Sequence, residues 1–185
     1  MPIDTKRIIA NALEEMLRNK SIDKITVSSL IEACGVSRQT FYYHFRDLMD
    51  VLEWLAQQDA QKLAERSMQA ETTHEALHAF LSYAVENHAL LRRLLESQRR
   101  AQIETILADL VTAYLWEVAR HRQLALPEDS AEVEAAIRFS VYGLVGILLT
   151  YGGKKELDQE RLIQWMETLL TAIFQSMEKK NGALK

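Results

Sequence analysis

The stretch that decides the fold is residues 35–45, GVSRQTFYYHF. It follows residues 26–33, TVSSLIEA, a short helical pattern in which Thr26 is placed to cap the first turn. Gly35 falls where the chain must end one helix and reverse, in a left-handed conformation that is cheap only for glycine. Ser37 then caps the next helix. Two helices joined by about three residues are typical of a helix-turn-helix, whose second helix enters the major groove of DNA.

The second helix of this pair divides into two faces. At about 100° per residue, Phe41 and Phe45 fall on one side and face a core. Gln39 and Tyr43 point the opposite way, and residues 33–46 contain no acidic side chain. A helix that enters the major groove must not repel phosphates and must offer hydrogen bonds to base edges. The pattern therefore predicts a DNA-reading helix.

Residues 5–55 resemble the N-terminal domain of TetR-family transcriptional regulators. The resemblance rests on Ile25-Thr26-Val27, Ile31, Ala33, Gly35-Val36-Ser37, Thr40-Phe41-Tyr42 and His44-Phe45, in this order and spacing. The run RQTFY at residues 38–42, with Trp54 downstream, also resembles the branch that includes dihydroxyacetone kinase regulators. The resemblance implies an all-α protein in two parts: a three-helix helix-turn-helix domain at residues 1–50, and a helical effector-binding and dimerisation domain at residues 51–185.

The helix geometry and the family resemblance both predict contacts to DNA. Base contacts are predicted from Arg38, Gln39 and Tyr43, and phosphate contacts from Thr26, Ser28, Thr40, Tyr42, His44 and Arg46. Phosphate contacts position the reading helix but carry no sequence information. The family often has a basic residue near position 28, and this chain departs from that pattern with a serine.

Composition agrees with a globular helical protein. The 185 residues are 48% hydrophobic and 26% charged, and only six glycines and two prolines interrupt them, which favours long helices over strands. No run of 18 or more apolar residues and no apolar leader occur, so a cytoplasmic location without a membrane segment is expected. The single Cys34 excludes an internal disulfide. The net charge of −4 is unusual for a DNA binder, although residues 1–50 balance to zero.

The last two predicted helices differ from the others because apolar residues cover more than one side. Over residues 137–149 one stripe is opposed by Phe139, Tyr142 and Gly146, and a helix that is apolar all round is buried on both faces. Two such helices from each of two copies make a four-helix dimer interface, as the resemblance also implies. Its candidates are Ile137, Val141, Leu144, Leu148, Leu162, Met166, Leu169 and Ile173.

An effector pocket inside the helical body is implied by the resemblance. Its candidate lining residues are Tyr83, Tyr114, Trp116, Phe139 and Tyr142, although each taken singly is more simply explained as core. Their apolar and aromatic character favours a hydrophobic or aromatic effector.

Other constellations indicate neither catalysis nor a cofactor. The sequence has no phosphate-cradling glycine loop and no His-Glu-x-x-His, so an enzyme is not expected. His74 and His78 are spaced to share a helix face, but no cysteine or second histidine pair accompanies them, so no metal site is predicted. The arginines at 92, 93, 99 and 100 form either a solvated face or an anion site.

The sequence thus predicts a TetR-like homodimer that binds an inverted-repeat operator in double-stranded DNA. The primary hypothesis is a repressor released by a small, largely apolar effector. The alternative is a DNA-binding regulator controlled by a partner protein.

Overall fold

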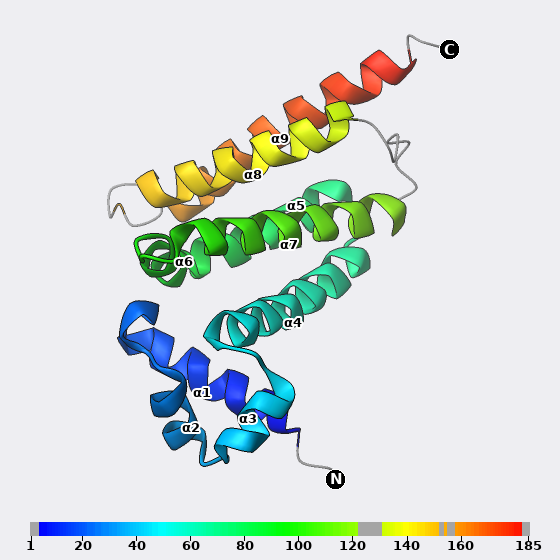
Figure 1. The fold of residues 1–185 in the computed structure, drawn as a ribbon. Coiled ribbons are helices and arrows are strands. Elements are labelled where there is room, and N and C mark those ends of the chain that lie inside the picture. Colours follow the sequence, from blue (N-terminus) through cyan, green and yellow to red (C-terminus); the bar gives the residue numbers. More distant parts are fainter. Residues whose placement is uncertain (1–3, 122–130, 152–153, 155–157, 183–185) are drawn as a thin grey trace. The chain divides into compact units, whose positions relative to one another are not determined.

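The computed structural model describes residues 4–121, 131–151, 154 and 158–182, and over these residues the chain forms helices without a strand (Figure 1). The helices are α1 (Thr5–Asn19), the 3-10 turn η1 (Ile22–Lys24), α2 (Val27–Cys34), α3 (Arg38–His44), α4 (Leu48–Gln69), α5 (Thr73–Glu86), α6 (His88–Leu95), α7 (Arg100–His121), α8 (Ala131–Tyr151) and α9 (Gln159–Gly182). The predicted all-α fold is confirmed.

The chain divides into two compact units. The first contains Met1–Asp59 and Leu90–Ile106, and the second contains Ala60–Ala89 and Leu107–Lys185. Helices α4 and α7 each contribute to both units. The predicted domain boundary at residue 50 remains a prediction about function, because α4 continues without a break beyond it.

The core of the first unit is built from the apolar faces of α1 to α3. The fully buried side chains here include Ile9, Leu13, Leu17, Ile22, Leu30 and Phe41. Helix α2 packs on α1 and on α3. The stripe in α1 recurs every three to four residues, the spacing of one helix face.

Residues 90–106 belong to this first unit through two polar contacts. The Arg93 guanidinium donates to the carbonyl of Arg18 in the last turn of α1. The backbone N–H of Gln98 donates to Oδ2 of Asp23 in η1, at 3.1 Å. The corner between α6 and α7 is thus fastened to the loop that follows α1.

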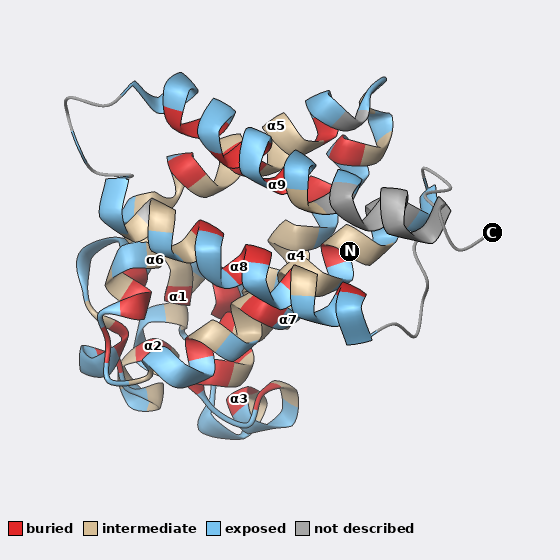
Figure 2. Cartoon of the chain, turned by 90° about the horizontal axis from the view of Figure 1, so that it is seen from above, coloured by how far each residue is buried: buried red, intermediate tan, exposed pale blue. Residues whose placement is uncertain are grey.

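The second unit packs α8 on α7 and α9 on both α5 and α8. A cluster of Ala108, Val133, Ile137 and Val141 joins α7 to α8. Buried and exposed positions alternate along α8 and α9, so each helix has an inner and an outer face (Figure 2). By length and composition alone α8 could cross a membrane, a test that core helices also pass. Its stripe packed on α7 identifies it as a helix of the body.

Candidate nucleic-acid interface

The turn between α2 and α3 is set by caps at both helix starts. At α2, Oγ1 of Thr26 accepts the N–H of Ser29 at 3.0 Å, and Oγ of Ser29 accepts the N–H of Thr26 at 3.0 Å. This reciprocal capping box satisfies two amides that the first turn leaves free. Gly35 ends α2 with φ +67°, and its N–H donates to Ile31 O at 2.9 Å. Ser37 then caps α3 by accepting the N–H of Thr40 at 3.0 Å.

The inner face of α3 is fixed by aromatic packing. Phe41 is fully buried and Phe45 almost so. The Phe45 ring meets the Trp54 ring of α4 edge to face, with centroids 6.2 Å apart. The sequence-based division of this helix into two faces is therefore confirmed for its core side, and Trp54 joins that core from α4.

The outer face of α3 presents the residues that were predicted to read bases. Arg38 and Gln39 are exposed, and Tyr43 is 84% exposed, as expected for side chains with no role in the fold. The Arg38 guanidinium carbon lies 5.8 Å from the centroid of the Tyr42 ring, one turn further along the helix. This cation–π contact restricts the arginine before any DNA is bound. Hydrogen-bonding groups thus stand outward without an acidic neighbour on the helix.

The residues predicted to contact phosphates fall into two groups. The hydroxyls of Thr26 and Thr40 already bond within the caps, Thr40 Oγ1 lying 2.7 Å from Ser37 Oγ. Ser28, Tyr42 and Arg46 are exposed, whereas His44 is half-buried with its ring against Tyr43. The exposed group has side chains that reach solvent, while the two threonines shape the turn.

The turn between α3 and α4 contains two acidic residues to which sequence reasoning did not assign a role. Oδ1 of Asp47 accepts the N–H groups of Met49 and Asp50, at 2.8 and 2.9 Å, and so caps α4. Oδ2 of Asp50 accepts the N–H of Arg46 at 2.8 Å and its Nε at 3.4 Å. The backbone bond from Arg46, followed by its side chain, lowers the pKa of Asp50 below its usual value. In the sequence, the two aspartates beside the start of α4 were the signal for these hydrogen bonds.

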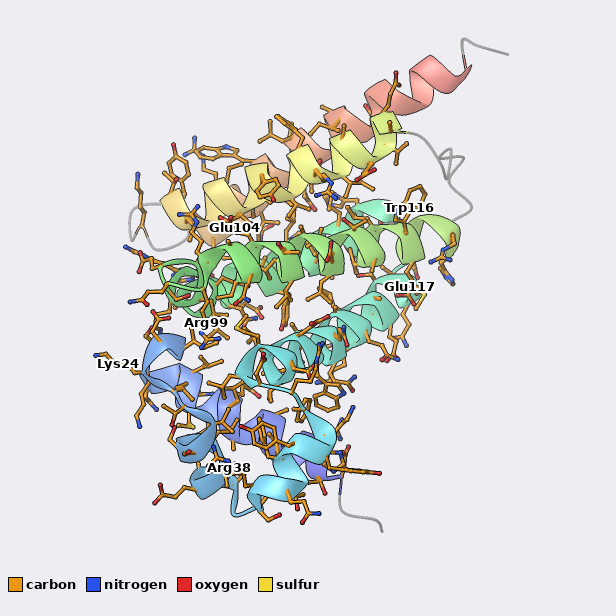
Figure 3. The ribbon with its side chains drawn as sticks, in the orientation of Figure 1. Lys24, Arg38, Arg99, Glu104, Trp116 and Glu117 are labelled. Atoms are coloured by element: carbon orange, nitrogen blue, oxygen red, sulfur yellow. The ribbon has the colours of Figure 1, made fainter. Side chains whose placement is uncertain are left out.

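The basic cluster near α6 is mostly engaged in local pairs. Nε of Arg92 lies 2.8 Å from Glu96, and Nε of Arg100 lies 2.7 Å from Glu104. Arg99 lies near Lys24, at the end of the first unit away from Arg38 (Figure 3). Arg92 and Arg100 therefore belong to a solvated face of i,i+4 pairs, while Arg93 donates to the carbonyl of Arg18.

The five candidates for an effector pocket lie in three separate places. Tyr83 and Tyr114 share a packed cluster, where Tyr114 stacks on Phe80 and its hydroxyl lies 2.7 Å from Ser67 Oγ. Trp116 packs on the α7–α8 cluster. Phe139 and Tyr142 are exposed on α8.

The eight candidates for a dimer interface are also distributed. Ile137, Val141, Leu144, Leu162 and Met166 are buried within the chain, Leu169 is exposed, Ile173 is half-buried, and the side chain of Leu148 lies outside the described residues. The buried members support the α8–α9 pair from inside. Outward lie the predicted Leu169 and also Phe139, Tyr142 and Trp165, which sequence reasoning did not place in the interface. Two exposed glycines, Gly143 and Gly146, lie on the same outer face of α8, and in the sequence they were the signal for that face.

These features define a class of protein. A capped helix-turn-helix whose second helix buries aromatic rings and exposes hydrogen-bonding groups is the architecture of a DNA-binding regulator. Residues 8–53 match the family of bacterial regulatory proteins, tetR family. The N-terminal part of the chain is thus similar to the TetR family, as its sequence motifs predicted.

A curated relative agrees with this similarity over half of the chain. The chain is 26% identical over 92 residues to the HTH-type dhaKLM operon transcriptional activator DhaS of Lactococcus lactis subsp. lactis strain IL1403, a match that spans 50% of this chain and 49% of that protein. The match therefore covers about half the length of this curated relative.

Solved structures share the fold over nearly the full length. A dihydroxyacetone kinase operon activator DhaS aligns with a TM-score of 0.55 at 19% identity, covering 96% of each chain. FadR of Thermus thermophilus, a TetR-family repressor solved with lauroyl-CoA, aligns with a TM-score of 0.59 at 21% identity, covering 90% of this chain and 93% of its own. These relatives are transcriptional regulators and not enzymes, in agreement with the sequence-based expectation.

Proposed function

We propose that this chain is a homodimeric transcriptional regulator that binds an inverted-repeat operator in the cytoplasm. The observation that carries the proposal is the outer face of α3, where Arg38, Gln39 and the 84% exposed Tyr43 offer hydrogen-bonding groups to a major groove. These three residues read bases. The exposed Ser28, Tyr42 and Arg46 contact phosphates, together with Thr26, Thr40 and His44.

A second copy of the chain occupies the outer face of α8 and α9. Phe139 is 70% exposed and Leu169 is 52% exposed, which is unusual for such large apolar side chains in a protein that stays monomeric. They border a groove of about 690 Å³ between the two helices, lined almost entirely by apolar residues. A Cβ added at Gly143 or Gly146 would meet nothing within 4 Å, so this face is open for close approach of a partner helix. The dimer places two α3 helices on one DNA, and the two half-sites follow its symmetry.

Control by a small, largely apolar effector is the first form of regulation that we propose. FadR of Thermus thermophilus, which has the same fold, was solved with lauroyl-CoA, an acylated ligand. In this chain the body has an aromatic cluster that includes Phe80, Tyr83 and Tyr114, which are side chains of the kind that line apolar ligand pockets. The effector binds one of two conformations of the body and shifts the population toward it. In that conformation the two helix-turn-helix domains of the dimer no longer match the operator, so the effector releases a repressor from DNA.

Control by a partner protein is the second form, and the packing around Tyr114 in the body favours it. DhaS is described as an activator, so a repressor role does not follow from that relative. Tyr114 is buried with its hydroxyl bonded to Ser67, so this part of the body is already filled. A compound that releases the protein from its operator selects the first form. Release or activation that requires a second protein selects the other.

The test of DNA reading is selection from a random-sequence duplex pool with the purified full chain, followed by sequencing of the bound molecules. Enrichment of an inverted repeat supports the proposal, and its half-site spacing locates the two heads. A folded dimeric sample that enriches no sequence at low salt contradicts direct operator reading.

A further inference from the structure

The side chain of Arg46 is held by the carboxylate of Asp50. Arg46 lies in the turn between α3 and α4, outside both helices, and its side chain is 84% exposed. Oδ2 of Asp50 accepts the backbone N–H of Arg46 at 2.8 Å and its Nε at 3.4 Å. One carboxylate oxygen thus holds both the backbone and the guanidinium of the same residue.

This contact leaves the outer part of the guanidinium available to another molecule. A guanidinium carries its N–H donors in a planar fork, and the bond to Asp50 uses the inner nitrogen, Nε. Nη1 and Nη2 lie at the outer end of this highly exposed side chain. Their N–H groups match two oxygens of a phosphate, which is why arginine binds phosphates bidentately. Asp50 therefore grips the arginine by the atom that a bidentate phosphate does not need.

Two cations keep Asp50 ionised. The backbone N–H of Arg46, then its side chain, and after these the charges of Arg46 and Lys6 lower the pKa of Asp50. Lys6 comes from the start of α1, and its Nζ lies 5.5 Å from the centroid of the Phe45 ring, beside Arg46 in the chain. At neutral pH the carboxylate is therefore charged and can hold the guanidinium.

Two further carboxylates act on Arg46 but are bonded to other groups. The hydrogen bond to Asp50 and its charge raise the pKa of Arg46, and the charges of Asp47 and Glu53 add to this shift. Asp47 caps the start of α4. Glu53 accepts the side-chain amide of Gln57 at 3.3 Å. The contact with Asp50 is thus the one through which the position of the guanidinium is set.

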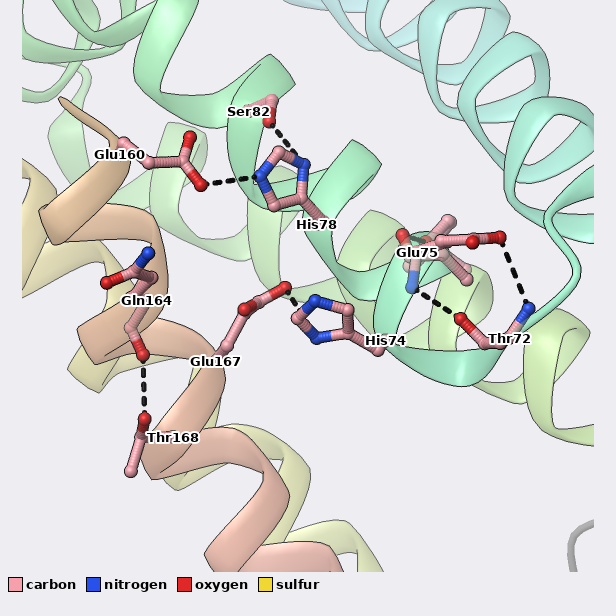
Figure 4. Close-up of polar contacts among 11 residues, drawn as sticks. Thr72, His74, Glu75, His78, Ser82, Glu160, Gln164, Glu167 and Thr168 are labelled. Carbon is pink, nitrogen blue, oxygen red and sulfur yellow. Dashed lines mark hydrogen bonds and ion pairs between the residues drawn. The ribbon is translucent and has the colours of Figure 1, made fainter.

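A role in stability alone does not explain the side-chain contact. Nε2 of His78 in α5 lies 3.2 Å from Oε1 of Glu160 in α9, and that pair links two helices of the second unit (Figure 4). The contact between Arg46 and Asp50 stays within one turn, which the backbone bond between the same residues already holds. Exposed ion pairs add little stability. The side-chain contact is better explained by binding.

We propose that Asp50 is a positioning residue for DNA binding, which holds Arg46 so that its outer nitrogens meet a phosphate of the operator backbone. This inference rests on the proposed function and adds an acidic residue to it. A carboxylate near DNA ordinarily weakens binding, because it repels phosphates. Removal of this carboxylate is expected to weaken binding instead, because an unrestrained arginine loses more conformational freedom when it reaches the phosphate.

The test replaces Asp50 by asparagine in the full chain. Asparagine keeps an oxygen that can accept the N–H of Arg46, so the turn can be retained while the charge is lost. The matched control is Glu53→Gln, which removes the same charge from the same helix without touching the contact. Affinity for a random duplex and for the selected operator is measured by fluorescence anisotropy over a series of salt concentrations, and thermal melting establishes folding.

Asp50→Asn is expected to bind both DNAs about 3- to 10-fold more weakly than the wild type, the loss of about one hydrogen bond. Its slope of log affinity against log salt should flatten by up to about 0.9 for each chain bound. Glu53→Gln should bind as tightly as the wild type or more tightly. In a chain that also carries Arg46→Ala, Asp50→Asn should cause no further loss.

Asp50→Asn that binds as tightly as Glu53→Gln, or a loss that persists without Arg46, would overturn the positioning role. If Asp50→Asn does not fold, Arg46→Lys decides, because lysine keeps the charge but has one ammonium for both the carboxylate and the phosphate. It is expected to lose nearly as much affinity as Arg46→Ala, and wild-type affinity would contradict the inference. A wild type that binds no DNA at low salt would overturn the proposed function together with this inference.

Discussion

Replacing Gln39 by alanine tests whether α3 reads base edges. Gln39 is exposed and lies on the face opposite the buried Phe41, so its removal leaves the core of the first unit intact. One lost bidentate base contact costs about 1–3 kcal/mol of binding free energy, which weakens operator affinity by roughly 5- to 150-fold. Binding to random DNA should stay unchanged, because phosphate contacts supply that affinity. Discrimination at one base pair in each half-site should relax.

The assay is competition measured by fluorescence anisotropy at one fixed salt concentration, with the selected operator, its single-base variants and a random duplex as competitors. Gln102→Ala is the matched control, since Gln102 is exposed on α7. Thermal melting establishes that both variants are folded. Equal loss on operator and random DNA would place Gln39 on a phosphate, and unchanged operator affinity would refute a contact altogether.

Three further changes test other parts of the account. Gly35→Ala should destabilise the folded chain by about 1–2 kcal/mol in urea unfolding, because φ is +67° while no neighbour lies within 4 Å of the added Cβ, so the cost is backbone strain. An unchanged urea midpoint of the Gly35→Ala variant would contradict this strain. Asp50→Ala should cost about 0.5–1.5 kcal/mol at neutral pH, because the N–H of Arg46 loses its acceptor. Because the pKa of Asp50 is lowered in the folded state, its contribution is present above about pH 4 and is lost as the pH falls through the folded value, so the two proteins should converge in acid titrations of stability. Gly143→Leu should leave folding intact, since the position is open, but block a second copy; sedimentation at several concentrations should show more monomer, and an unchanged dimer would exclude this face.

The fold of the first unit could be predicted from the sequence because its signals are local. Thr26, Gly35 and Ser37 occupy the positions that caps and a left-handed turn require, and Phe41 and Phe45 lie one turn apart on the core side. The helical periodicity of apolar residues was enough to separate the inner face of α3 from its outer face. The role of Asp50 depends on a bond to the amide of Arg46 that spacing suggests but does not specify.

The second unit could be predicted less well, because α8 is apolar on both sides. Ile137 and Phe139 are both hydrophobic, yet Ile137 is packed on α7 and Phe139 is 70% exposed. Which stripe faces inward depends on where neighbouring helices lie, and hydrophobicity does not encode that. The histidine spacing on α5 was visible in the sequence, but its partners on α9 are more than eighty residues away and only the folded chain brings them close.

In the proposed function, two copies of the chain read one operator through two α3 helices. The most direct measurement is the affinity and stoichiometry of the full chain on the complete inverted repeat and on a single half-site of equal total length, at the same salt concentration. Two chains are expected to bind each duplex that carries the repeat. The affinity for the repeat is expected to be at least tenfold higher than for the half-site, since only the repeat engages both helix-turn-helix domains of the dimer. Equal affinity for the two duplexes, with one chain bound to each, would contradict it.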